Sequence, residues 1–148
     1  MRIKNIRQLV LYMSVCMLFT FFVSCSEDDG PSSPTISDFS GTWSGSILHP
    51  AYDGGSLEVL MVEKDAISGS YTMRLTEYIE SNGRSRVENY GGELTEGDRN
   101  SRSSVSFTLM VSGSLWDFTG ASQAKNEISG DWKVRTRPGI SGTFQIKR

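Results

Sequence analysis

The stretch Ile-Ser-Gly-Asp-Trp at residues 128–132 recurs, with substitutions, at three other places in the chain. Each copy has a large apolar residue, a small hydroxyl residue, a glycine, any residue and then an aromatic residue. The other copies lie at residues 39–43, 67–71 and 140–144. In an extended strand the first, third and fifth positions share one face, so each copy places a glycine between two large apolar side chains. Glycine at such a position marks a bend or close packing, and the repeat therefore predicts strands that coil around a narrow core.

Apolar and polar residues alternate with a period of two through most of the chain after residue 36, which indicates strands rather than helices. The alternation is clearest at residues 104–112. Asn82-Gly83 predicts a two-residue type I′ hairpin turn. Ser112-Gly113-Ser114 and Pro138-Gly139 predict tight reversals. Together these signals predict strands at residues 39–48, 56–64, 66–78, 84–95, 103–112, 114–122, 126–136 and 139–147.

The short links between successive strands determine the expected topology. Strands joined by short links are antiparallel neighbours, so the chain predicts an up-and-down sheet. Closing that sheet into a barrel removes its exposed edges. We therefore expect an all-β fold, an eight-stranded antiparallel up-and-down β-barrel, with a β-sandwich as the alternative. The interior of such a barrel is filled by side chains or by one small ligand, and the repeats do not decide between the two.

The first 24 residues predict a lipoprotein signal peptide rather than a part of the fold. Basic residues precede an apolar run at residues 9–23 that is too short for a typical transmembrane helix. The sequence Phe-Val-Ser-Cys at residues 22–25 resembles a bacterial lipobox. The resemblance implies that Cys25 is lipidated, becomes the mature N-terminus and anchors the protein in the outer membrane.

Residues 25–37 are acidic and rich in serine and proline, and we expect them to form a flexible tether ahead of a barrel domain at 38–148. The run Glu27-Asp28-Asp29 resembles the surface-export signal of Bacteroidetes lipoproteins, which implies a position on the cell surface. The alternative is that these residues keep a periplasm-facing tether soluble. Cys16 would be removed with the signal peptide, so the mature domain is expected to lack disulfides.

The sequence Gly41-Thr42-Trp43 on the first predicted strand resembles the Gly-x-Trp of calycins, the group formed by lipocalins, fatty-acid-binding proteins and avidins. This resemblance implies an eight-stranded barrel with a ligand pocket at its open end. It also implies that Trp43 closes the floor of the barrel, packed against a basic side chain at the end of the last strand, Lys147 or Arg148.

Aromatic residues are the candidates for ligand binding, although most of them are expected in the core. Trp116 and Trp132 lie on consecutive predicted strands and are the preferred pair, followed by Tyr71 and Trp43. Asp117 is the carboxylate that the strand alternation could place inside the barrel.

We expect no catalytic site, metal site or cofactor. His49 is the only histidine and is expected to be a solvated loop residue. The abundant serines single out no nucleophile for a triad. A zinc site needs several Cys, His or carboxylate ligands, and the mature domain has no thiol.

Two functions remain open from the sequence. The first is a lipid-anchored envelope protein whose lipocalin-like barrel binds a small, partly apolar ligand. The alternative is a surface protein-interaction or inhibitor lipoprotein with a solid barrel and no small-molecule ligand, which contacts an envelope or host protein through the hairpin at 78–90. A nucleic-acid partner is not expected, because 17 Asp and Glu outnumber 15 Lys and Arg.

Overall fold

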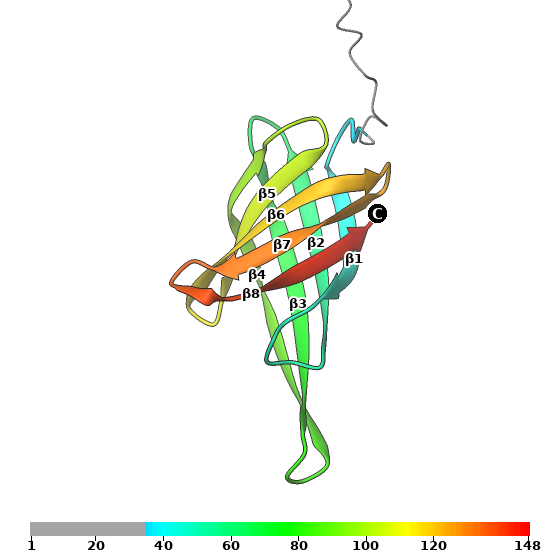
Figure 1. Cartoon of the computed structure of the whole chain (residues 1–148). Helices are drawn as coiled ribbons and strands as arrows, with labels where there is room; N and C mark the ends of the chain where they lie inside the picture. Colours follow the sequence, from blue (N-terminus) through cyan, green and yellow to red (C-terminus); the bar gives the residue numbers. More distant parts are fainter. Residues whose placement is uncertain (1–34) are drawn as a thin grey trace, which may run out of the picture. The chain divides into compact units, whose positions relative to one another are not determined.

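The predicted up-and-down barrel is confirmed by the computed structural model, which describes residues 35–148 (Figure 1). All neighbouring strands are antiparallel and follow one another in chain order around a closed barrel. The sandwich alternative is wrong, because the first strand pairs with the last from Ser44–Lys147 to Ile47–Phe144. The strands are β1 (Gly41–Ile47), β2 (Gly54–Glu63), β3 (Ile67–Ile79), β4 (Arg84–Arg99), β5 (Ser104–Val111), β6 (Ser114–Ala124), β7 (Glu127–Val134) and β8 (Arg137–Lys147).

The repeated five-residue unit faces inward, as expected, and its glycines allow neighbouring backbone, an arginine side chain or a ring to approach closely. The apolar residues at the first and fifth positions are buried in all four copies, except for the half-buried Ile140. A Cβ added to Gly142 would lie 2.8 Å from Cζ2 of Trp132, and one added to Gly120 would lie 2.8 Å from Cζ of Phe144. The protein's own rings therefore take the space beside Gly142 and Gly120, whereas a Cβ at Gly69 or Gly130 would collide with a carbonyl of the neighbouring strand.

Phenylalanine rings fill the middle of the barrel. The ring centroid of Phe118 lies 5.0 Å from that of Phe107 and 5.3 Å from that of Phe144. Among the buried polar side chains of the described part, none lacks a hydrogen-bond partner. The interior behaves as a packed core rather than as a deep ligand chamber.

The turn predictions hold at one of three places. Ser112 and Gly113 both have positive φ, 49° and 76°, as a type I′ turn requires. The predicted turn at Asn82-Gly83 is wrong in type: it is a four-residue loop at 80–83, in which only Gly83 has positive φ. Pro138-Gly139 is not the reversal itself, which lies at residues 135–136. It lies at the start of β8, where the register shifts and the missing proline N–H is tolerated.

The side chain of Arg148 covers one end of the barrel. The Arg148 guanidinium lies over the Trp43 ring at 5.0 Å, and its Nη1 donates to the carbonyls of Asp38 (2.9 Å) and Ser40 (2.8 Å). Of the two basic residues that the calycin resemblance offered, Arg148 is therefore the one against Trp43. Lys147 instead pairs with Glu127 at 3.1 Å.

A second arginine extends the folded domain toward the N-terminus. Arg99 lies over the Phe39 ring at 4.9 Å, pairs with Glu63 at 2.7 Å and donates to the Ile36 carbonyl. Ile36 is only 1% exposed, so the predicted tether boundary at residue 37 is wrong and the domain includes Ile36. The predicted signal peptide, Cys25 and the tether up to residue 34 lie outside the described residues.

Strands β3 and β4 continue past the barrel wall as a two-stranded arm, which we define as residues 77–86 (Figure 1). The pairing of β3 with β2 ends at Thr76, opposite Gly54. The pairing of β4 with β5 begins only at Leu94, opposite Leu109. The arm therefore forms because two neighbouring strands are longer than the strands on either side of them.

The glycine positions lead to a stability prediction for Gly142→Ala. The added Cβ would meet the Leu48 carbonyl at 2.1 Å as well as the Trp132 ring. We expect urea denaturation to show a loss of about 1–3 kcal/mol or more in the free energy of unfolding, because overpacking forces backbone and ring apart. Gly139→Ala is the matched control on the same strand, since nothing lies within 4 Å of its added Cβ. Equal stabilities of the two variants would contradict this account of the glycines.

Candidate functional site

Three aromatic rings gather at the open end of the barrel. Trp116 on β6 and Trp132 on β7 stack with ring centroids 4.6 Å apart and planes 13° apart. His49, from the loop between β1 and β2, stacks on Trp132 at 5.0 Å and on Trp116 at 5.4 Å. The prediction of a solvated His49 is therefore wrong: burial against the two indoles lowers the pKa of its imidazole.

The loop at residues 48–53, which we call the cover loop, is hydrogen-bonded across the open end of the barrel, which we call the mouth. Leu48 donates its N–H to the Thr143 carbonyl at 2.9 Å, and its own carbonyl accepts from Trp132 Nε1 at 2.9 Å. At the other end of the loop, Asp53 donates its N–H to the Thr76 carbonyl at 2.9 Å. These bonds to β8, β7 and β3 position His49 over the tryptophan pair.

A carboxylate held by two phenols forms the opposite wall. Glu88 on β4 accepts from the Tyr52 hydroxyl at 2.6 Å and also from the Tyr90 hydroxyl. Arg86 pairs with its other oxygen. The Tyr52 bond is the main cause that lowers the pKa of Glu88, whereas burial and the carboxylate raise the pKa of Tyr90. At neutral pH the site therefore holds a charged carboxylate and two protonated phenols.

A cavity of about 360 Å³ lies between these two walls. The phenols and Glu88 form its polar side, and Arg137 lies at its edge. Ser112 and Ser114 add hydroxyl groups beside the turn between β5 and β6. The apolar and aromatic side is formed by Leu75, Val111, Trp116, Val134 and Ile140, with His49 above them.

The structure separates the four residues predicted to bind ligand. Trp116 lines the cavity and is 7% exposed, and Trp132 lies directly behind it. Trp43 is fully buried at the other end of the barrel, where its Nε1 donates to the Phe39 carbonyl at 2.7 Å. Tyr71 is also buried, and its hydroxyl donates to the Met110 carbonyl. Only the tryptophan pair belongs to the mouth.

Tyr52, Glu88 and Tyr90 were not among the residues predicted from the sequence to bind a ligand. Strand alternation could have placed Glu88 and Tyr90 on one face, since they lie two residues apart. Nothing local indicates that this is the inner face, because it follows from the pairing of Glu88 with Leu75 and of Tyr90 with Met73 on β3.

The suggestion that Asp117 points into the barrel is wrong. Its neighbours Trp116 and Phe118 occupy the inner face, so Asp117 faces outward. It pairs with Arg135 at 2.7 Å and accepts from the Thr108 hydroxyl at 3.0 Å. These bonds, led by that to Arg135, lower the pKa of Asp117 and mark it as part of a surface ion pair.

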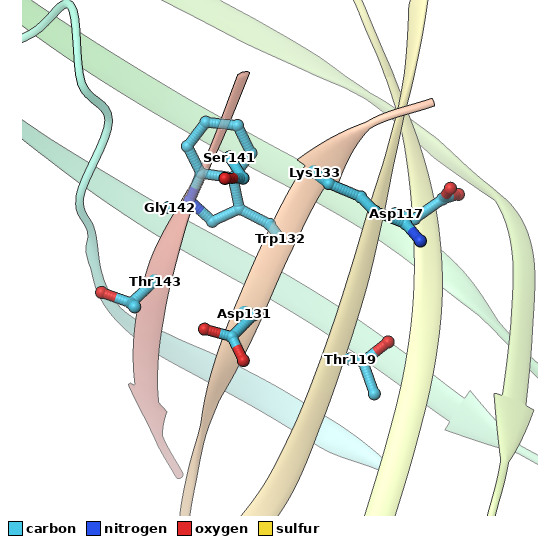
Figure 2. Close-up of a pocket in the computed structure, with 8 residues that line it drawn as sticks. All are labelled: Asp117, Thr119, Asp131, Trp132, Lys133, Ser141, Gly142 and Thr143. Atoms are coloured by element: carbon cyan, nitrogen blue, oxygen red, sulfur yellow. The ribbon is translucent and has the colours of Figure 1, made fainter. Parts of the chain in front are cut away.

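A second concavity, of about 460 Å³, lies on the outer surface of β6, β7 and β8 (Figure 2). Small polar and charged side chains such as Thr119, Asp131 and Thr143 line it. Trp132 borders it at Gly142, but its ring is 1% exposed and offers almost no surface for stacking. The mouth cavity is therefore the stronger candidate site.

The burial of His49 predicts a pH-dependent stability. A folded-state pKa below 6.5 means that the unfolded chain takes up the proton first. The stabilisation is therefore complete above that pH and is lost as the pH falls below it. We expect NMR titration of the single imidazole to give a pKa below 6.5, and the free energy of unfolding to fall as the pH falls from above 6.5 through the folded-state pKa. The variant His49→Phe keeps a stacked ring and should lose that part of the pH dependence, whereas a pKa at or above 6.5 would contradict the burial of the imidazole.

Comparison with known proteins adds no relative to this picture. No protein-family model matches the chain, and the search of curated proteins found no match. Within residues 35–148, there is no group of His, Cys, Asp and Glu side chains that could hold a metal ion. The same residues contain no helix long and apolar enough to cross a membrane. The geometry of the barrel mouth therefore carries the functional argument.

Proposed function

We propose that this protein is a lipid-anchored binding protein of the bacterial cell envelope that holds a small, partly apolar ligand at the mouth of its barrel. The observation that carries the proposal is the cavity of about 360 Å³ with one aromatic wall and one polar wall. Ligand sites combine these features, mostly apolar lining with a few fixed polar groups, and begin at about 300 Å³. Binding rather than catalysis is proposed, because the two phenols and the carboxylate of the polar wall are already hydrogen-bonded to one another.

The two walls indicate how a ligand would lie. An apolar ring or chain would pack on Trp116, next to the imidazole of His49. Tyr52 and Tyr90 direct their hydroxyl protons to Glu88, so their oxygens are left to accept hydrogen bonds. The polar end of the ligand is therefore a hydrogen-bond donor, such as an amine, that bonds the phenol oxygens, because Glu88 is already paired with Arg86.

The packed interior limits how deep the ligand goes. Trp132 and the phenylalanine rings occupy the space below the mouth. The proposed ligand therefore occupies the rim, whereas a long chain threaded along the barrel axis would need several core rings to move.

The anchoring part of the proposal depends on the N-terminal sequence. The basic residues, apolar run and lipobox-like residues 22–25 support lipidation of Cys25 and an outer-membrane position. The acidic run after Cys25 supports display on the cell surface in the manner of Bacteroidetes lipoproteins.

Two small probes of equal apolar size test the proposal: 2-phenylethylamine and 3-phenylpropionate. We expect NMR titration to shift the signals of Trp116 and Tyr90, with the amine binding more tightly. Trp116→Leu should weaken amine binding by about tenfold, the loss of one good aromatic contact. Asp131→Ala, in the outer concavity of Figure 2, is the matched control and should bind normally. If neither probe shifts the mouth signals, or if Asp131→Ala is the more damaging change, the proposed site is refuted.

The second candidate is a protein-interaction lipoprotein with a solid barrel. The arm favours it, because Tyr78 is 54% exposed on a hairpin that continues past the barrel wall. The same NMR titration separates the two functions. If neither probe shifts the signals of Trp116 and Tyr90, the arm is favoured as the binding element.

A further inference from the structure

The two outer edges of the β3–β4 hairpin differ in whether other parts of the chain already bond their backbone groups. On the β3 side the cover loop blocks the edge. Asp53 donates its N–H to the Thr76 carbonyl at 2.9 Å, and its carboxylate accepts the N–H of Tyr78. Backbone groups that would attract another strand are thus already bonded, as is usual where proteins protect a sheet edge.

On the β4 side the edge is open. Residues 84–93 pair with β3, and β5 joins β4 only from Leu94 onward. The Met110 carbonyl on β5 is bonded instead by the Tyr71 hydroxyl, which reaches it from β3. Every second residue of an antiparallel strand turns its N–H and C=O away from its partner, so this stretch presents a row of backbone donors and acceptors. We call residues 84–93 the free β4 edge.

We propose that the free β4 edge pairs with the same edge of a second copy of this chain, antiparallel, with Val87 opposite Val87. The pairing does not depend on the proposed function, because it requires no bound ligand, although Glu88 and Tyr90 of this edge also line the cavity. Edge-to-edge addition of strands is a common mode of protein recognition. The two-fold relation makes the interface self-complementary and closes it at two copies.

The side chains of β4 select this register. With Val87 opposite Val87, each Arg86, which already pairs with Glu88 of its own chain, also faces Glu88 of the other copy, and each Arg84 faces Tyr90. Opposite charges directly across a strand pair stabilise it, and like charges destabilise it. The two-fold axis passes through Val87 in this register. Moving it by one residue, to Arg86 or to Glu88, would place Arg86 against Arg86 or Glu88 against Glu88. Of these three registers, only the proposed one avoids both repulsions.

The opposite face of the edge is compatible with the same pairing. Val87 is 40% exposed, and in a two-fold pair it would bury against its own copy. Ser85 would lie opposite Asn89, which allows hydrogen bonds between them. Because the arm continues past the barrel wall (Figure 1), the residues nearest its tip are accessible to another chain.

Cross-linking between copies tests this register. The full chain is used in detergent, with Cys16→Ser and Cys25→Ser so that introduced cysteines are the only thiols. With a short bis-maleimide, Val87→Cys should form dimers about tenfold faster than Leu60→Cys, an exposed control site on β2. A mixture of Ser85→Cys and Asn89→Cys chains should cross-link faster than either chain alone.

Charge reversal provides a second, independent test of the register. Adding Arg86→Glu to Val87→Cys should reduce its cross-linking to the rate of Leu60→Cys, because Glu would then face Glu88. Adding Glu88→Arg as well should restore the rate, since the pair is complementary again. The proposal is overturned if Val87→Cys reacts no faster than Leu60→Cys, or if the Ser85→Cys and Asn89→Cys mixture shows no preference. The mixture leaves Glu88 in place, so it decides the matter even if Glu88→Arg disturbs the fold.

Discussion

The narrowness of the barrel is the constraint on which the rest of the structure depends. Eight short antiparallel strands can close only around a small interior, and that interior has to be filled to the density of a protein core. Here large rings fill it, and some of them pack against positions without a side chain. Gly142 beside Trp132 and Gly120 beside Phe144 provide those positions. The recurring glycine between two apolar residues thus permits close packing inside the barrel.

The buried rings also organise the irregular backbone at both ends of the barrel. Trp43 donates to the Phe39 carbonyl near the sealed end, and Trp132 donates to the Leu48 carbonyl at the open end. Tyr71 donates to the Met110 carbonyl, where β5 has lost its β4 partner. In each case the ring fills the core while its polar atom satisfies a carbonyl outside the regular ladder. Buried polar groups need such partners, so packing and loop position are coupled.

The two ends differ because different side chains close them. Arg148 and Arg99 cover Trp43 and Phe39 and bond the carbonyls of residues 36–40. At the open end a loop with one imidazole covers the tryptophan pair, and a cavity remains beside it. The open end therefore places an aromatic cluster next to hydrogen-bond acceptors, whereas at the other end two arginines bond the N-terminal segment to the barrel.

Strand number, topology and the inward face of the repeats were determined by the sequence itself, because alternation and short links are local properties of the chain. The tryptophan pair of the mouth and the basic residue over Trp43 were also accessible, through strand order and family resemblance. The tertiary structure decided the rest. Tyr52 reaches Glu88 across 36 residues, and Arg99 holds Ile36 across 63, and no local pattern encodes such contacts. The stacking of His49 and the open edge of β4 likewise depend on where neighbouring strands end, which only the closed barrel determines.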